Sequence, residues 1–213
     1  MNWNIPTNLL SASRFRTVCS SPPHSLKDNL ISFHTLHTIR TMSEKQRLNI
    51  RALEPGDADF MYEVENDSSA WRYSDTVAPL SRRILRDYAL NYDADPFSAG
   101  QIRLIVTEEG NNTPVGIVDL YELSQRHLRA FVGIYICSDY RRHGYAAEAI
   151  SMMEKYAFHT LHLHQLGAKI EESNTHAIRL FESLGYECRG RLKEWLSAPD
   201  GCYSDMLIYT KSL

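Results

Sequence analysis

The residues best suited to chemistry form one short loop, Arg141-Arg142-His143-Gly144-Tyr145-Ala146. The loop follows an apolar alternating run and precedes apolar residues at helical spacing, so we expect it to open a helix. Backbone N–H groups, a helix N-terminus and arginine side chains would meet there, and together they suit a pyrophosphate. Gly144 and the small Ala146 would let phosphates approach the main chain closely. The alternative interpretation is a turn that caps a helix, with Arg142 and His143 simply exposed.

The loop lacks the glycine spacing of nucleotide-binding loops. It resembles the coenzyme A pyrophosphate loop of the GNAT superfamily of N-acetyltransferases, written [QR]-x-x-G-x-[GA]. Residues 174–186, Asn-Thr-His-Ala-Ile-Arg-Leu-Phe-Glu-Ser-Leu-Gly-Tyr, resemble the second signature of that superfamily. The order of elements over residues 47–211 is similar too. Within the superfamily the chain looks most like bacterial spermidine acetyltransferases and ribosomal-protein N-terminal acetyltransferases.

The periodicity around these motifs predicts alternating strands and amphipathic helices. We expect strands at 48–53, 102–106, 115–123, 128–137, 166–171, 186–196 and 203–211, and helices at 60–65, 81–92, 144–160 and 174–184. The resemblance implies an α/β (α+β) GNAT fold. Its mixed sheet of about seven strands would splay into a V between the fourth and fifth strands, flanked by about four helices.

Composition sets the limits of the assignment. The 213 residues suit a catalytic domain over residues 43–213 and a disordered or dispensable extension over residues 1–42. The extension carries four basic residues and one acidic residue, so a targeting segment and an ordered element are the alternatives. A net charge of −3 and the lack of a run of ~20 apolar residues argue against nucleic-acid and membrane partners.

The four cysteines form no regular framework, which favours a reducing, cytoplasmic compartment; they are Cys19, Cys137, Cys188 and Cys202. His159, His162 and His164 straddle a predicted helix end and strand start, so their side chains should diverge and no metal is expected. Residues 43–213 are mildly acidic, which weakly favours a cationic substrate.

The resemblance implies acetyl-CoA as co-substrate. Its binding residues would come from the fourth strand, the loop and the second signature: Ile134, Tyr135, Ile136, Cys137, Arg141, Arg142, His143, Gly144, Tyr145, Ala146, Asn174 and Phe181. In the superfamily the strand pairs with the pantetheine arm, and one of its N–H groups polarises the thioester oxygen. The strand side chains could instead be core residues, and Asn174 could also cap a helix.

Acetyl transfer needs a neutral amine, a stabilised carbonyl oxygen and a thiolate that can leave. No covalent enzyme intermediate is needed when both substrates lie side by side. Many members of the superfamily place a tyrosine near position 181, but here Phe181 has no hydroxyl. The thiolate would leave to water, or Tyr135 or Tyr186 would supply the proton. Glu122 is the first candidate for the base that removes the amine proton. The alternative is that Glu122 is simply an exposed residue of a hairpin.

Glu65, Asp67, Asp75 and Glu122 are the candidates for binding a cationic acceptor. The acceptor would be a polyamine such as spermidine. A protein N-terminus, another small amine and a non-catalytic acyl-CoA-binding module are the alternatives. The resemblance also implies a homo-oligomer.

Overall fold

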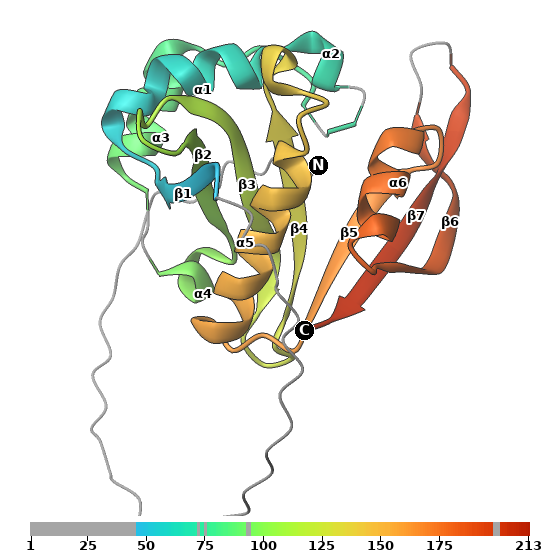
Figure 1. Cartoon of the computed structure of the whole chain (residues 1–213). Coiled ribbons are helices and arrows are strands. Elements are labelled where there is room, and N and C mark those ends of the chain that lie inside the picture. Colours follow the sequence, from blue (N-terminus) through green and yellow to red (C-terminus); the bar gives the residue numbers. More distant parts are fainter. Residues whose placement is uncertain (1–45, 72, 75, 93–94, 198–200) are drawn as a thin grey trace, which may run out of the picture. The chain divides into compact units, whose positions relative to one another are not determined.

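The computed structural model describes residues 46–71, 73–74, 76–92, 95–197 and 201–213 (Figure 1). The predicted extension over residues 1–42 and the candidate Asp75 lie outside the described residues. One mixed sheet runs in the order β1-β2-β3-β4-β5-β7-β6. Its strands are β1 Leu48–Ala52, β2 Ile102–Glu108, β3 Pro114–Ser124, β4 Arg129–Ile136, β5 Gln165–Glu171, β6 Glu187–Ser197 and β7 Tyr203–Ser212.

The α-helices are α1 Ala58–Glu65, α2 Ser68–Trp71, α3 Arg82–Leu90, α4 Pro96–Ala99, α5 Tyr145–His159 and α6 Thr175–Ser183. Short 3-10 turns cover Pro55–Asp57 and Ser138–Tyr140. The four predicted helices correspond to α1, α3, α5 and α6. The additional helices α2 and α4 have four residues each, which is too short to leave a readable periodicity. The predicted mixed sheet of seven strands is confirmed.

The predicted splay lies between β4 and β5. These parallel strands are paired only at Arg129–Gln165, Ala130–Leu166 and Phe131–Gly167. A Cβ atom on Gly167 would come within 2.7 Å of the Phe131 ring, so the last pair requires a glycine at that position. Beyond it the strands diverge, and β5, β7, β6 and α6 stand apart from the first four strands (Figure 1).

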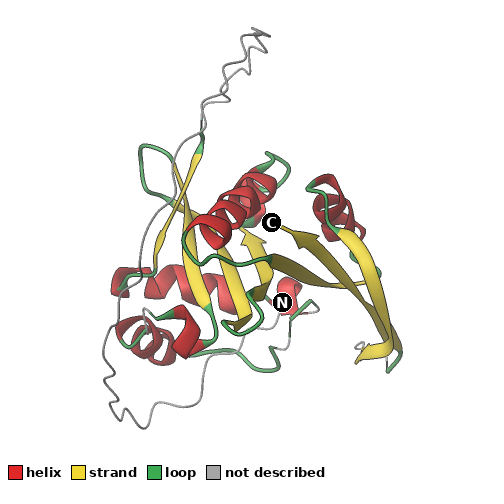
Figure 2. Cartoon of the chain, turned by 90° about the horizontal axis from the view of Figure 1, so that it is seen from below, coloured by secondary structure: helices red, strands yellow, loops and turns green. Residues whose placement is uncertain are grey.

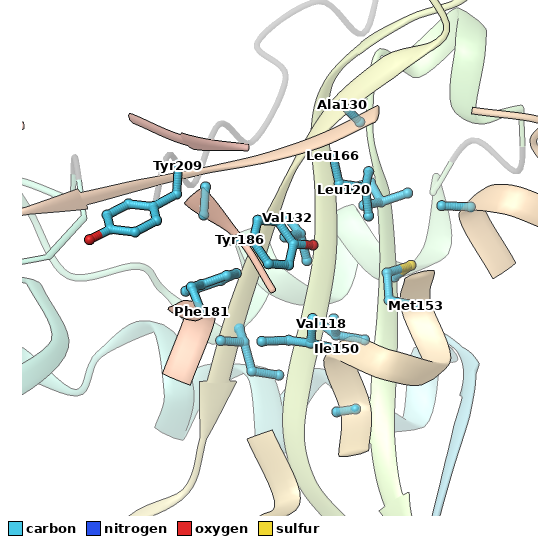
Figure 3. Close-up of a cluster of buried hydrophobic side chains, with 14 of the residues drawn as sticks. Val118, Leu120, Ala130, Val132, Ile150, Met153, Leu166, Phe181, Tyr186 and Tyr209 are labelled. Carbon is cyan, nitrogen blue, oxygen red and sulfur yellow. The ribbon is translucent and has the colours of Figure 1, made fainter. Parts of the chain in front are cut away.

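Helices cover both faces of the sheet (Figure 2). On one face α5 and α6 pack on β3–β5, and the core there is drawn in Figure 3. Four residues of the predicted apolar stripe of α5 are buried in this core, namely Ala149, Ile150, Met153 and Ala157, and the fifth, Ala146, is partly buried against it. On the other face α1 and α3 pack on β2–β4 through Met61, Leu85, Ile105 and Ile117. Each large apolar side chain buried this way stabilises the fold by roughly 1.5–3 kcal/mol.

Of the helices that the structure describes, none combines the length and the apolar character required to cross a membrane.

Candidate functional site

A cavity of about 360 Å³ opens where β4 and β5 separate. Strands β4, β5 and β7, helix α6, the start of α5 and the segment around α2 all contribute to its wall. The polar and aromatic side chains in the lining are Ser69, Tyr73, Ser74, Tyr121, Tyr135, Arg141, Lys169, Glu171, Asn174, His176 and Phe181. The cavity therefore brings together the two sequence motifs, which lie about 30 residues apart.

The motif loop leads from β4 into α5. Arg142 and Gly144 both have left-handed backbone conformations, with φ values of 66° and 79°. Gly144 is the N-cap of α5 and has no side chain to cap the first-turn N–H groups, so a bound anion could accept their hydrogen bonds. Arg141 and Ala146 line the cavity, whereas the other predicted loop residues lie outside its lining: Arg142, His143, Gly144 and Tyr145. The Arg141 Nε donates to the Ile136 carbonyl at 2.8 Å and so ties the loop to the strand end.

The predicted strand residues differ in access to the cavity. Ile134, Tyr135 and Ile136 line it. Cys137 lies just outside the lining, and its N–H donates to the Val115 carbonyl at 2.9 Å. This N–H is already used by the sheet, so a main-chain contact between Cys137 and the cofactor stays a prediction.

Asn174 and Phe181 belong to α6 and both line the cavity. The Asn174 Oδ1 accepts from the Ala177 N–H at 3.1 Å, so this residue caps the helix and faces the cavity at once. The Phe181 ring lies edge-to-face on Tyr186 with a centroid distance of 5.0 Å (Figure 3). Tyr186 is buried outside the cavity lining, and burial together with Glu154 raises its pKa.

Tyr135 therefore presents the better-placed hydroxyl of the two candidate tyrosines. Its Oη lies 2.7 Å from Asp67 Oδ2, and burial, reinforced by this carboxylate, raises the pKa of Tyr135. Burial alone would raise the pKa of Asp67. Hydrogen bonds from Ser69 and Tyr135, together with Arg141 at 3.9 Å, outweigh that effect and lower it. Asp67 thus links the segment before α2 to Arg141 in the motif loop.

Glu65 does not reach the cavity. Its Oε1 accepts from Arg103 Nη1 at 2.8 Å, and Arg103 also pairs with Asp119 at 3.0 Å. Glu65 and Arg103 are only 4% and 5% exposed, so an acceptor cannot contact them. The assignment of Glu65 to the acceptor site stays a prediction that this burial does not favour. Removing one member of such a buried group costs about 3–5 kcal/mol, which indicates a structural role.

Glu122 lies at a bulge in β3, where its φ is 49° and the pairing with β4 shifts. The regular alternation assumed for this strand is interrupted there. The Glu122 carboxylate pairs with Lys169, which lines the cavity while Glu122 itself does not. Glu122 is therefore connected to the cavity only through its ion pair with Lys169, and its role as a base stays a prediction.

Lys169 and Glu171 both line the cavity from β5, and neither was among the residues predicted from the sequence. The Lys169 ammonium lies 4.6 Å from the centre of the Phe131 ring. Glu171 is buried, and its two carboxylate oxygens lie 2.9 and 2.7 Å from the Ser173 hydroxyl. Strand alternation places Gly167, Lys169 and Glu171 on one face, and this signal could have identified them.

Comparisons with known proteins agree with this geometry. Residues 47–187 match the family model described as the acetyltransferase (GNAT) domain. The chain is 27% identical over 151 residues to the spermidine N(1)-acetyltransferase of Escherichia coli (strain K12), covering 71% of this chain and 78% of that protein. It is 25% identical over 185 residues to Bacillus subtilis YdaF, provisionally named a ribosomal N-acetyltransferase, covering 80% of this chain and 93% of that protein.

A similar solved structure is that of a spermidine N-acetyltransferase from Vibrio cholerae in complex with CoA and spermine. Its TM-score is 0.70 at 26% sequence identity, and the match covers 78% of this chain and 95% of that one.

Proposed function

This chain belongs to the acetyltransferase (GNAT) domain family, and from that premise we propose that it transfers the acetyl group of acetyl-CoA to a primary amine. The observation that carries the proposal is the cavity in the splay, because it joins the phosphate loop to Asn174 and Phe181. The similar Vibrio cholerae enzyme was solved with CoA, which supports the same co-substrate here.

The phosphates would bind at residues 141–146 and the first turn of α5. The pantetheine arm would follow Ile134–Ile136 of β4, whose neighbour β5 turns away beyond Phe131. Asn174 and Phe181 would contact the arm from the opposite wall. These residues fit the co-substrate because they combine an open strand edge, free helix N–H groups and an apolar wall.

Acetyl-CoA supplies an activated thioester to this site. The amine nitrogen forms a bond to the acetyl carbon, the carbon–sulfur bond breaks, and the amine proton must leave while the sulfur gains one. We assign the protonation of the departing sulfur to the Tyr135 hydroxyl, since Phe181 has no hydroxyl. The raised pKa of Tyr135 keeps that hydroxyl protonated at neutral pH. Glu122 and Glu171 are the candidate carboxylates for removing the amine proton.

The acceptor we favour is a polyamine such as spermidine, in line with the names of the Escherichia coli and Vibrio cholerae relatives. A specific observation favours a peptide N-terminus as the second candidate. Among the described residues, Glu171 is the one acidic side chain in the cavity lining, where Lys169 and Arg141 also lie. A single carboxylate suits an acceptor with one positive charge, such as a peptide N-terminus, better than a polyamine with three positive charges.

The test is thiol release from acetyl-CoA in the presence of matched acceptors: spermidine, spermine, and a short peptide with a free or a blocked N-terminus. We expect spermidine to give the highest kcat/KM. A higher value for the free peptide, abolished by blocking, would favour the second candidate. CoA binding without turnover on any amine would point to an acyl-CoA-binding module.

A further inference from the structure

A feature that the motifs do not include ties the phosphate loop to the first strand. Arg47 lies just before β1, about a hundred residues from the loop along the chain. Its Nη1 donates to the His143 carbonyl at 2.9 Å, immediately before Gly144. A Cβ atom built on Gly144 would lie 3.4 Å from the Arg47 Nη2, so the guanidinium touches the loop at its tightest bend.

A carboxylate on the first turn of α5 fixes this guanidinium. Glu148 Oε2 accepts from Arg47 Nε at 3.0 Å and pairs with Nη2 at 2.9 Å. Glu148 Oε1 accepts from the main-chain N–H groups of Arg47 and Leu48 at 2.8 and 3.1 Å. The guanidinium also lies 5.2 Å from the centre of the Tyr145 ring. One arginine thus holds a loop carbonyl, the helix start and a strand at once, as its planar fork permits.

We propose that Arg47 is a positioning residue for the pyrophosphate loop, held in place by Glu148. The proposal rests on the proposed use of acetyl-CoA. Arg47 keeps the His143 carbonyl turned toward the strand, and this fixes the left-handed bend at Gly144 from which the helix N–H groups start. Without it the loop must be ordered by the ligand itself, and binding is weakened by that cost.

Direct contact between Arg47 and a phosphate is the competing explanation. A substitution of Glu148 distinguishes this explanation from the positioning role. If Arg47 bound a phosphate by charge, Glu148→Gln would remove a nearby anion and release the guanidinium, so CoA would bind more tightly. If Arg47 acts by position, the same substitution loosens the loop and CoA binds more weakly. The two explanations therefore predict changes of opposite sign.

The experiment measures CoA binding by calorimetry, and KM for acetyl-CoA together with kcat. We expect Arg47→Ala to raise the Kd for CoA about tenfold, or about 1.4 kcal/mol, while kcat at saturation changes less than twofold. Glu148→Gln should raise the Kd several-fold. The double variant should bind CoA about as weakly as Arg47→Ala alone, because both changes break the same ion pair between Arg47 and Glu148.

The matched control is Arg51→Ala, since Arg51 lies in β1, four residues after Arg47, and pairs with Asp57 through two bonds of 2.7 and 2.8 Å. It should lower thermal stability without changing the Kd for CoA. Equal Kd values for wild type and Arg47→Ala, or tighter binding by Glu148→Gln, would overturn the inference alone. A folded wild-type protein that binds no CoA would instead overturn the proposed function.

Discussion

At the scale of single residues, Tyr135 carries the assignment of the acid. We expect Tyr135→Phe to lower kcat roughly 10²-fold, at the low end of acid–base catalysis because a thiol is already a good leaving group. Burial and Asp67 raise the pKa of Tyr135, so its phenol stays protonated and the ratio of wild-type to variant rates should be constant from pH 6 to 9. The pH–rate profiles of both enzymes measure this.

The control for that prediction is Tyr186→Phe, because Tyr186 is a second buried tyrosine that lies outside the cavity lining. Tyr186→Phe should change kcat by less than about twofold relative to the wild type. Equal losses in both variants would show that the hydroxyls act through stability, and an unchanged kcat in Tyr135→Phe would remove that residue from the reaction.

The two carboxylates near Lys169 can be told apart by the same method. If Glu122 is the base, Glu122→Gln should lower kcat/KM by roughly 10². Glu171→Gln should chiefly raise KM for the acceptor if Glu171 binds the ammonium group. An effect of Glu171→Gln on kcat with no effect of Glu122→Gln would move the role of base from β3 to β5.

At the scale of elements, the start of α5 depends on the backbone of Gly144. We expect Gly144→Val to raise the Kd for acetyl-CoA at least tenfold, about 1.4 kcal/mol, because a branched side chain strains a φ of 79° and crowds the phosphate path. Calorimetry measures the change. Gly110→Val is the control, since Gly110 has a φ of 91° in the β2–β3 turn with no atom near its Cβ position. Equal weakening in both variants would contradict the assignment.

The start of α1 provides a pH-dependent prediction about stability. Burial would raise the pKa of Asp57, but hydrogen bonds from Arg51 and the Glu54 N–H outweigh it and lower the pKa. Stability from this group is therefore complete above the unfolded pKa, near ~3.9, and is lost as the pH falls through the folded value. We expect Asp57→Asn to lower the free energy of unfolding by about 1–2 kcal/mol at pH 7, and by less at pH 3.

Urea unfolding at the two pH values measures that difference. Asp59→Asn is the control, because Asp59 is largely exposed in its pair with Arg82 and such pairs contribute ~0–1 kcal/mol. A loss for Asp57→Asn that is the same at pH 3 and pH 7 would contradict the ionic explanation.

At the scale of the whole molecule, the family match begins at residue 47, after the proposed extension. We expect a chain that begins at Met42 to match the 213-residue chain in turnover and to differ from it by less than about 2 °C in melting temperature. Calorimetric melting and thiol release measure both. A clear loss of either would show that residues 1–41 contribute to the working enzyme.

The order and type of the long elements could be predicted, because each has its own periodicity and the two motifs fix their arrangement. The partners of the charged residues could not. The Glu65–Arg103 contact spans 38 residues and the Asp67–Tyr135 contact spans 68. Both depend on how α1 and its following segment pack on the sheet. The bulge at Glu122 likewise depends on one left-handed residue that no alternation pattern announces.

Because β4 and β5 pair at only three positions, each of these central strands has an unpaired edge beyond the last pair. Main-chain groups on such edges have no partner strand and can template pairing with another strand. Amide protons of β4 that point toward β5 beyond Phe131 should therefore exchange with deuterated solvent quickly in the ligand-free protein and slowly once CoA covers them. The same edges make the empty enzyme the form most prone to self-association, so added CoA should slow its aggregation on storage.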